Sequence, residues 1–433
     1  MNKKDSQIDW IGDIPMQWKL IKGKYVFNSQ KEINKNLKCT NLLSLTYYGV
    51  LNKDFTGSGG LRPKDYETYQ IFQKDDLVFK MIDLENIKTS RVGIVHEEGI
   101  MSSAYIRQIP LKEKINSKFA YWFYYDLYKK EIFNAIGSGV RSTLSSSDLL
   151  EIILPIPPLE EQKLISRYLD KKTKQIDRLV EKIQKKIELL NEQRTSLINQ
   201  CVTKGLDPNV EMKDSGVEWI GEIPNHWMIR RLAVLGWFSK GKNVTKSDLT
   251  EYGEPVILYS HLYTTYGRVV KSPIFRISSD KALKATKISN GMFLFTSSGE
   301  TVDDIGKTLL YSGDCDISVG GDLVIFCMKS REDNYPGFFS FLFNSDFCQK
   351  QKSSMSRGEI VVHIYEKQLR ELKVFVPPIS EQVKITKKLE RFDKNNQSLI
   401  DNYNKKINIL KEYRQSLISS VVTGKVRLTE DML

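Results

Sequence analysis

Residues 157–162 of the chain read Pro-Pro-Leu-Glu-Glu-Gln, and a segment of the same kind, Pro-Pro-Ile-Ser-Glu-Gln, returns at residues 377–382. Proline does not fit inside a helix, whereas acidic or capping side chains favour the positive N-terminus of one, so a helix is expected to begin just after each proline pair. No further proline or glycine occurs until Gly205 in the first copy and Gly424 in the second. The sequence therefore predicts two helices of roughly 44 residues, each ~66 Å long at about 1.5 Å per residue.

Two other motifs also occur twice, in the same order along the chain. Residues 10–15 (Trp-Ile-Gly-Asp-Ile-Pro) return at residues 219–224 (Trp-Ile-Gly-Glu-Ile-Pro), each copy followed by another tryptophan. The pattern Arg-x-Ser-Leu-Ile at residues 194–198 returns at residues 414–418. Three matches in one order indicate two equivalent halves built on a repeated frame. The tryptophans of this frame are expected to pack each half against its helix; they are Trp10, Trp18, Trp219 and Trp227.

The apolar residues of both predicted helices recur in steps of three and four, with one additional four-residue step near the middle. The first helix has Ile165, Leu169, Ile176, Leu179, Ile183, Ile187, Leu190, Leu197 and Cys201 at these positions, and the second has Ile385, Leu389, Phe392, Leu399, Tyr403, Ile407, Leu410, Leu417 and Val421. The remaining faces are strongly charged. An intramolecular coiled coil is the simplest way to bury both stripes, and pairing between two molecules is the alternative.

The short connection between the halves favours an antiparallel pair of helices. The first helix ends near Gly205, and the second half restarts at Trp219. If a pseudo-two-fold axis relates the halves, antiparallel helices would place one globular domain at each end of a rod. One turn of B-DNA is ~34 Å, so such a rod would suit two sites about one turn apart on one face of the duplex.

Between the repeated motifs the two halves show the same kind of sequence pattern but little residue-by-residue identity. Short β-type runs, such as residues 76–82 and 291–296, alternate with turns rich in Gly, Ser, Asn and Asp. This pattern predicts one mixed α/β domain in each half, so that one scaffold would present two different specificities. The expected parts are a first domain at residues 1–156, a long helix at 157–205, a second domain at 206–376, a second long helix at 377–424 and a tail at 425–433.

The composition fits a globular protein with a polyanionic partner. At 433 residues the chain exceeds one ordinary core, and 40% of it is hydrophobic. Lys and Arg number 65 against 53 Asp and Glu, a formal charge of +12. Such an excess favours binding to phosphates with release of counterions, and a merely solvated basic surface is the alternative.

Cysteine usage and the first residues indicate a cytoplasmic protein. The start, MNKKDSQIDW, lacks the apolar core of a signal peptide, and no apolar run approaches the ~20 residues that a membrane helix needs. The cysteines are scattered and never form a C-x-x-C pair, so neither a zinc site nor a disulfide framework is expected. They are Cys39, Cys201, Cys315, Cys327 and Cys348.

Taken together, the doubled motifs resemble those of the specificity subunit of type I restriction–modification enzymes, over essentially the whole chain. The resemblance implies an α+β architecture: two mixed α/β target-recognition domains joined by two long antiparallel coiled-coil helices. It also implies that each recognition domain reads one half of a bipartite, asymmetric DNA target. By the same resemblance, two methyltransferase subunits would dock around the helices and restriction subunits would complete the complex. S-adenosylmethionine, ATP and Mg would then be bound by those partners, with none held by this chain.

Motifs of catalysis are missing from the sequence. Neither Asn-Pro-Pro-aromatic nor Asp-Pro-Pro-aromatic occurs, although an amino-methyltransferase would need such a loop to hold the target amine. No G-x-x-x-x-G-K-[ST] loop is present to cradle a nucleotide phosphate. The four histidines are not at metal-binding spacing. The chain is therefore expected to recognise DNA without being an enzyme.

The candidate DNA-contacting residues lie in loop-rich stretches that combine aromatic, basic and small polar side chains, the types that contact base edges, sugars and phosphates. In the first domain they are Tyr47, Tyr48, Lys53, Arg62, Lys64, Lys80, Arg91, Ser103, Tyr105 and Arg141. In the second domain they are Lys240, Lys242, His261, Tyr263, Thr265, Tyr266, Arg268, Ser297, Ser298, Lys307, Ser318, Arg357 and His363. For each of them, a solvated surface charge or a packed core side chain is the alternative.

Two other classes of function stay open at this point. One is a free-standing DNA-binding regulator, or a decoy that binds only the methyltransferase. The other is a purely structural coiled-coil adaptor, which would leave the two divergent domains without a purpose. Specific DNA binding, alone or with the methyltransferase, separates these classes.

Overall fold

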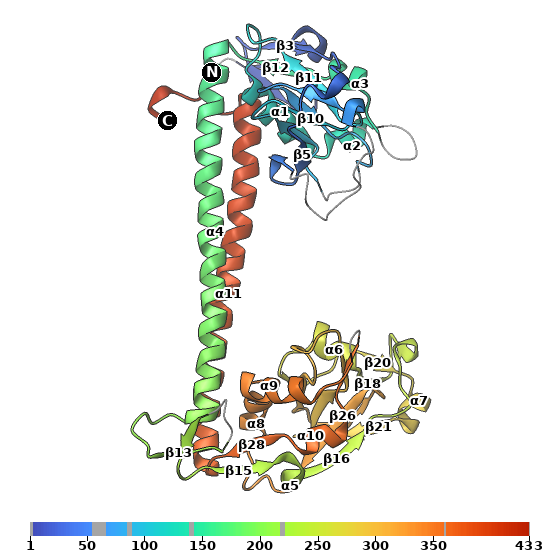
Figure 1. Ribbon diagram of the computed structural model, residues 1–433, viewed down its shortest axis with the longest axis vertical. Coiled ribbons are helices and arrows are strands. Elements are labelled where there is room, and N and C mark those ends of the chain that lie inside the picture. The colour runs from blue at the N-terminus through green and yellow to red at the C-terminus, as the bar shows by residue number, and fades with distance from the viewer. Residues whose placement is uncertain are drawn as a thin grey trace. The chain divides into compact units, whose positions relative to one another are not determined.

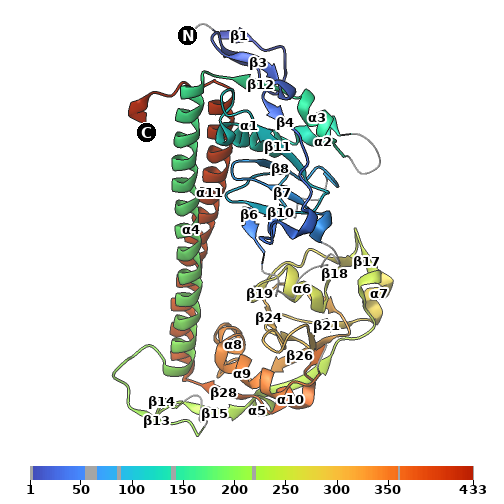
Figure 2. The same ribbon diagram turned by 45° about the horizontal axis from the view of Figure 1, so that its top comes forward.

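The structure is a computed structural model that describes residues 3–53, 66–84, 89–137, 143–216, 221–358 and 361–432. The chain divides into two compact units, the first formed by Met1–Gln184 with Asn404–Leu433 and the second by Lys185–Tyr403. Each unit holds one mixed α/β domain and one half of each of two long helices (Figures 1 and 2). None of the described helices is long and apolar enough to cross a membrane.

The first domain is built on a four-stranded antiparallel sheet with the strand order β4-β11-β8-β9, accompanied by four two-stranded pairs: β1–β2, β3–β12, β5–β6 and β7–β10. Its strands are β1 (Lys3–Asp5), β2 (Asp13–Pro15), β3 (Lys19–Lys22), β4 (Phe27–Asn28), β5 (Leu43–Thr46), β6 (Gly49–Asn52), β7 (Gln70–Phe72), β8 (Leu77–Phe79), β9 (Val92–Ile94), β10 (Gly99–Met101), β11 (Ile106–Pro110) and β12 (Ile153–Ile156). Its short helices are α1 (Ser117–Lys129), α2 (Ile132–Ile136) and α3 (Ser146–Glu151).

The central strand β8 is buried on both faces, because successive side chains of a strand point to opposite sides of the sheet. Phe79 joins the core in which Tyr124 of α1 lies, with the ring centroids 5.0 Å apart. Val78 joins a separate cluster beneath β5–β6 and β7–β10. Thus α1 covers one face of the sheet and two strand pairs cover the other.

The second domain contains two five-stranded sheets, with the orders β16-β26-β22-β24-β19 and β17-β20-β18-β25-β21, and the pairs β13–β14, β15–β28 and β23–β27. Its strands are β13 (Met212–Asp214), β14 (Glu222–Pro224), β15 (Met228–Arg231), β16 (Gly236–Lys240), β17 (Leu249–Thr250), β18 (Glu254–Ile257), β19 (Val269–Val270), β20 (Arg276–Ile277), β21 (Thr286–Ile288), β22 (Phe293–Thr296), β23 (Ser298–Gly299), β24 (Thr308–Tyr311), β25 (Ile317–Val319), β26 (Leu323–Met328), β27 (Val362–His363) and β28 (Lys373–Val376). Its short helices are α5 (Leu232–Leu235), α6 (Tyr259–Thr264), α7 (Ser279–Lys284), α8 (Pro336–Phe343), α9 (Asp346–Met355) and α10 (Glu366–Arg370).

In the second domain β22 takes the place that β8 has in the first. Phe293 packs against Phe343 of α8, with ring centroids 5.0 Å apart. The next residue, Leu294, points the other way and joins a cluster with Ile288 and Ile317 of the second sheet. The two sequence runs expected to form strands are thus the central buried strands of the two domains.

The long helices α4 (Leu159–Lys204) and α11 (Ile379–Val422) lie side by side within each unit, as Figures 1 and 2 show. In the first unit the start of α4 packs with the end of α11, and in the second unit the end of α4 packs with the start of α11. The prediction of an antiparallel intramolecular pair of long helices between mixed α/β domains is therefore confirmed.

The buried stripe of the long helices differs from the predicted one at two positions. Leu179 and Leu399 were expected in it but are 49% and 48% exposed. Val180 packs against the core instead of Leu179. The stripe has turned by one residue there, because the additional four-residue step in the pattern shifts the face that meets the partner helix.

The repeated tryptophan and Glu-Gln motifs meet each other in the first unit. Trp18 is buried, and its indole Nε1 donates a hydrogen bond to Glu161 Oε1 at 3.2 Å. The side chain of Gln162, also buried, accepts from the backbone N of Asn116 at 2.7 Å and donates to the backbone O of Pro157 at 2.9 Å. Glutamine at this position therefore joins the start of α4 to the residue that caps α1.

The second unit repeats these contacts. Trp227 Nε1 donates to Glu381 Oε2 at 3.0 Å. Gln382 accepts from the backbone N of Tyr335, which precedes α8, at 2.8 Å, and donates to the backbone O of Pro377 at 2.8 Å. The sequence motifs predict helix caps and packing tryptophans. The structure adds that tryptophan, glutamate and glutamine act together as one joint.

The repeated arginines connect the two long helices. Arg414 of α11 binds Asp177 of α4 in the first unit, with Nε–Oδ1 at 2.9 Å and Nη2–Oδ2 at 3.3 Å. In the second unit Arg194 of α4 binds Asp393 of α11 through the corresponding pairs of atoms, at 2.9 Å and 3.0 Å. Such paired N–H···O bonds are the strong, directional form of the arginine–carboxylate interaction, so each fixes the register of one helix against the other.

Each long helix ends on a glycine that touches a frame tryptophan. Gly205 after α4 has φ of +75°, and a Cβ there would lie 2.8 Å from Glu381 Oε1 and 3.3 Å from the Trp227 ring. Gly424 after α11 has φ of +72°, and a Cβ there would overlap Pro15 and lie 3.1 Å from the Trp18 ring. A left-handed conformation and a close approach both require glycine at these helix ends.

Candidate nucleic-acid interface

The first domain presents two tyrosines at the tip of the β5–β6 hairpin. Tyr47 is 60% exposed and Tyr48 is 88% exposed, and their rings lie edge to face with centroids 5.8 Å apart. Thr46 holds the turn, since its Oγ1 accepts from the backbone N of Tyr48 at 3.1 Å and donates to the backbone O of Gly49 at 2.9 Å. Two aromatic rings held in solvent by a fixed turn can stack on sugars or contact thymine methyl groups.

The hairpin tip is fixed to the segment that connects β8 and β9. The link is the backbone N of Ser90, which donates to the backbone O of Thr46 at 3.3 Å. Within the segment itself, Lys80 Nζ donates to Thr89 Oγ1 at 3.3 Å. Arg91 was predicted to contact DNA, but its side chain is only 1% exposed, and Nη1 donates to the backbone O of Ile82 at 3.0 Å. Arg91 therefore supports this segment from inside and is not a surface cation.

The other described candidates of the first domain do not gather at one place. Lys53 is exposed at the end of β6, and Ser103 is exposed between β10 and β11. Tyr105 packs partly against the cluster beneath β5–β6, and burial raises the pKa of its hydroxyl. Arg62, Lys64 and Arg141 lie outside the described residues, as does Trp219 of the frame.

The second domain gathers several candidates around the strand pair β23–β27. Ser298 pairs with His363 across the two strands, and Ser298 Oγ lies 3.0 Å from His363 Nδ1. The backbone groups of Arg357 and His363 exchange hydrogen bonds of 3.0 Å and 2.8 Å, and the Arg357 side chain is exposed. Tyr365, 54% exposed, lies nearly parallel to the His363 ring with centroids 6.1 Å apart. The result is a polar and aromatic surface that includes the exposed Arg357 side chain.

Lys307 and Tyr263 extend this surface. Lys307 Nζ lies over the Tyr263 ring, 5.5 Å from its centroid. The Tyr263 hydroxyl lies 2.8 Å from Thr296 Oγ1 and 3.0 Å from the backbone O of Ser298. Tyr263 is consequently a fixed platform for the lysine, and its hydroxyl is already engaged within the protein. We call Ser298, Lys307, Arg357, His363 and Tyr365 the second reading surface.

Several candidates of the second domain prove to be structural. His261 is 5% exposed, its Nδ1 accepts from the backbone N of Leu258 at 3.1 Å, and burial lowers its pKa to about 4. Ser318 is fully buried in β25, and Ser297 is 8% exposed. Neither of these serine side chains reaches the surface, so their predicted contact with DNA was wrong.

Arg268 and its neighbours were also placed differently from the prediction. The Arg268 guanidinium carbon lies 3.5 Å from the centroid of the Phe341 ring of α8, and burial lowers its pKa to about 10. The Tyr266 hydroxyl accepts from the backbone N of Ile274 at 2.8 Å and is thereby held within the domain. Thr265 is exposed. The aromatic and arginine side chains of this Tyr-Thr-Thr-Tyr-Gly-Arg stretch are thus held within the domain, and its two threonines, Thr264 and Thr265, are exposed.

Lys240 and Lys242 belong to a group of four exposed lysines. Thr286 Oγ1 donates to the backbone O of Lys240 at 3.2 Å, and Asn243 Nδ2 donates to the backbone O of Lys284 at 3.0 Å. These bonds hold residues 240–243 next to residues 284–287. No ion pair joins the four lysines to a carboxylate in the described part of the chain. We call Lys240, Lys242, Lys284 and Lys287 the lysine patch.

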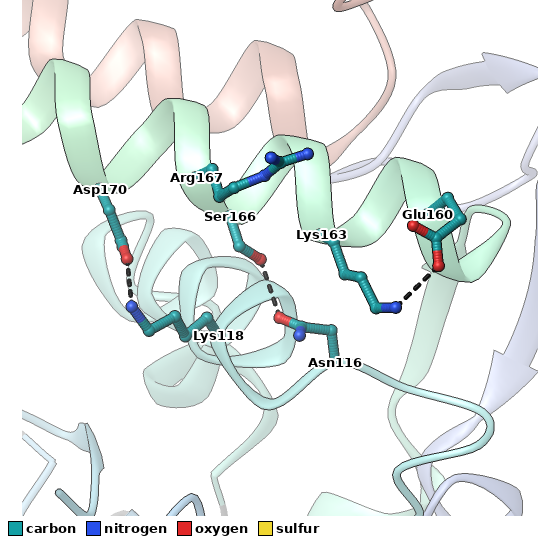
Figure 3. A pocket seen from close by; sticks show the side chains of 7 residues that line it. All are labelled: Asn116, Lys118, Glu160, Lys163, Ser166, Arg167 and Asp170. Atoms are coloured by element: carbon teal, nitrogen blue, oxygen red, sulfur yellow. Dashed lines mark hydrogen bonds and ion pairs between the residues drawn. The ribbon is translucent and has the colours of Figure 1, made fainter. Parts of the chain in front are cut away.

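A charged pocket of about 420 Å³ lies in the first unit, between the start of α1 and the first turns of α4 (Figure 3). Lys118 pairs there with Asp170, and Lys163 pairs with Glu160 at 2.7 Å. Ser166 Oγ donates to Asn116 Oδ1 at 2.9 Å. Arg167, the third cation of the pocket, lies 3.5 Å from Glu430 Oε1. Since all three cations are paired with acids, the pocket does not favour a phosphate, and the contacts of Lys118 and Asn116 serve to attach α1 to α4.

Sequence reasoning missed Tyr365, Lys284 and Lys287. Tyr365 follows His363 by two residues, and an alternating pattern in this stretch could have indicated a common face. Lys284 and Lys287 are 42 and more residues from Lys242 along the chain, and only the fold brings them together. In the described segments no group of three or more His, Cys, Asp or Glu side chains could hold a metal ion.

Comparison with known proteins agrees with this architecture. The model of the type I restriction modification DNA specificity domain matches the chain twice, at residues 15–189 and 224–409. The MjaVIII specificity subunit of a type I restriction enzyme from Methanocaldococcus jannaschii is 24% identical over 345 residues, which cover 77% of this chain and 75% of that protein.

Solved structures share the fold. The HsdS subunit from Thermoanaerobacter tengcongensis matches with a TM-score of 0.55 and 14% identity, over 95% of this chain and 98% of that one. A chain from a structural study of complex assembly and conformational transition in the type I R-M system matches with a TM-score of 0.72 and 12% identity, over 95% of this chain and 99% of that one. Two matched domains, which together span most of the sequence, show that the chain belongs to the type I restriction–modification DNA specificity family, where its role is to supply DNA sequence specificity.

Proposed function

We propose that the two domains read the two halves of a bipartite, asymmetric DNA target, one domain for each half. The observation that carries this proposal is the repetition of one frame around two different inserts, the inserts being the parts of the two domains that lie between the repeated motifs. The joints Trp18–Glu161 and Trp227–Glu381 have the same geometry, whereas the surfaces that the two domains expose have different side chains. A protein that reads two unrelated half-targets needs domains that attach to the helices in the same way but expose different side chains.

Different side chains would recognise the bases and bind the phosphates. In the first domain Tyr47, Tyr48 and Lys80 would contact the half-target, and in the second domain the second reading surface would do so. Serine, histidine and arginine can bond to base edges, and tyrosine can stack or contact methyl groups. The lysine patch would instead bind phosphates, which positions a protein on the duplex without selecting sequence.

Catalysis would belong to the partners. We expect two methyltransferase subunits to bind along the long helices and restriction subunits to join them, with S-adenosylmethionine, ATP and Mg held by those subunits. Adenine would be the methylated base. The charged outer faces of α4 and α11 offer long accessible surfaces for such partners. A cytoplasmic location follows from this role.

The test is methylome sequencing of a host that makes this chain with its neighbouring methyltransferase, against a host that makes the methyltransferase alone. A bipartite adenine-methylated motif that appears only with this chain is the expected result. Two variants then assign the halves: Tyr47→Ala with Tyr48→Ala should relax one half of the motif, and His363→Ala with Arg357→Ala should relax the other.

The contrary outcome is equally specific. If both proteins are produced and associate but no new methylated motif arises, the chain does not direct methylation. A regulator or a decoy that only binds the methyltransferase would then explain its two domains better.

A further inference from the structure

Lys352 of α9 is a fully buried amine in the second domain. Its Nζ donates to the backbone O of Gly306 at 2.7 Å and to the backbone O of Phe343 at 3.0 Å. Burial lowers its pKa to about 8. Burying an amine without a carboxylate is costly, so an apolar side chain would suit this position better if packing were its only purpose.

Two more side chains on the same face of α9 hold the same segment. Gln349 Nε2 donates to the backbone O of Ile305 at 2.9 Å, and Ser353 Oγ donates to the backbone O of Val302. Residues 349, 352 and 353 are separated by three and four positions, so they share one face of the helix. Three donors from α9 therefore satisfy three carbonyl groups between β23 and β24.

The far end of this segment is fixed as well. Asn344, which follows α8, accepts from the backbone N of Thr308 at 3.2 Å and donates to the backbone O of Thr308 at 3.0 Å. Lys307 thus lies between Gly306 and Thr308, both of which are held by side chains. The chain leaving α9 leads directly to Arg357, so one helix is connected to both parts of the second reading surface.

We infer that α9 is the positioning element of the second reading surface, and that Lys352, with Gln349 and Ser353, sets the position from which Lys307 meets DNA. This inference rests on the proposed function. Base discrimination depends on placing donors to within a fraction of an ångström, so loss of these bonds should weaken discrimination more than it weakens DNA binding as such. The effect should be confined to the half-target that the second domain reads.

The experiment compares the complete complex of this chain with its methyltransferase, carrying either the wild-type chain or Lys352→Met, which keeps the length of the side chain but removes its donors. Binding is measured to the methylome-derived target and to targets with single base changes in either half. We expect Lys352→Met to lose about tenfold or more of its discrimination in the second half, with the first half changed less than about twofold. Amide hydrogen exchange of residues 302–308 should become faster.

Lys350→Met is the matched control, since Lys350 lies on the exposed side of α9 and should leave both halves unchanged. Equal loss in both halves, or unchanged discrimination, would refute the positioning role. If Lys352→Met does not assemble, Gln349→Ala with Ser353→Ala is judged by the same criteria. A wild-type complex that ignores changes in the second half refutes the proposed function instead.

Discussion

The two units agree closely in their frames and differ in their inserts. In both, a buried tryptophan donates to a glutamate, and a buried glutamine holds the residue that precedes the covering helix. The inserts, however, are built on one four-stranded sheet in the first domain and on two five-stranded sheets in the second. The frame depends on side chains that satisfy specific polar atoms, which few substitutions preserve. The inserts need only one central strand, one covering helix and an exposed edge.

Removing a frame tryptophan should have the largest effect, and the same effect in both units. Trp18→Ala and Trp227→Ala each empty a fully buried site and remove the indole N–H that donates to the partner glutamate. Glu381 keeps its contact with His226 Nε2 at 2.8 Å. We expect each to lower the free energy of unfolding of its own unit by about 3–5 kcal/mol. Urea unfolding, followed by hydrogen exchange in each unit, measures the two losses separately.

Trp237 provides the matched control, because it is 52% exposed on β16. Trp237→Ala should cost less than about 1 kcal/mol. Losses that differ between Trp18→Ala and Trp227→Ala by more than about 2 kcal/mol would contradict the equivalence of the two frames.

The glutamines test the same equivalence at a smaller magnitude. Gln162→Leu leaves the backbone N–H of Asn116 without its acceptor, and Gln382→Leu does the same to Tyr335. Each should cost about 2–3 kcal/mol, because a buried polar group that loses its partner bears the full desolvation penalty. Thermal unfolding measures this loss. Gln397→Leu, an exposed position of α11, should stay within about 0.5 kcal/mol of the wild type.

The frame could be predicted from the sequence because its signals are repeated and local. Proline pairs, an uninterrupted stretch and a terminal glycine define a long helix whatever the insert contains. The partners of Glu161 and Gln162 could not be predicted, since Trp18 and Asn116 lie more than 40 residues away and no spacing rule joins them. The exposed Leu179 shows the same limit, because a change in phase of the stripe is visible only against the partner helix.

The candidate site was predictable by composition but not residue by residue. Tyr48 and His261 belong to similar polar and aromatic stretches, yet one is 88% exposed and the other 5%. Arg91 and Arg268 looked like surface cations, but one supports a loop from inside and the other lies on the Phe341 ring. The direction in which a loop side chain points depends on distant packing, which a sequence pattern does not contain.

Removing the arginine of each arginine–aspartate pair should cost different amounts of stability in the two units, because the surroundings of the two arginines differ. Arg414 contacts Asp177 and also lies over the rings of Trp122 and Tyr125, at 5.9 Å and 5.6 Å from their centroids. We expect Arg414→Ala to cost about 1–2 kcal/mol and Arg194→Ala about 0.5–1 kcal/mol, since only the former loses aromatic packing. A double-mutant cycle with Asp177→Ala isolates the ion pair from the aromatic contacts. Equal costs for the two arginines would show that the rings contribute nothing.

The lysine patch should have the smallest effect on the fold and a distinct effect on binding. Replacing Lys240, Lys242, Lys284 and Lys287 by glutamine should leave base preference unchanged and make DNA affinity less dependent on salt. Each lost phosphate contact lowers the slope of log affinity against log salt by ~0.9. Lys22 and Lys24 are the control in the first domain, because the amines of both are held by the Glu151 carboxylate at 2.7 Å. Their replacement by glutamine should leave the slope unchanged. If the patch variant keeps the wild-type slope, or if its methylated motif changes, these lysines do not serve as phosphate contacts. The proposed division of the second domain into base-contacting and phosphate-contacting side chains would then be wrong.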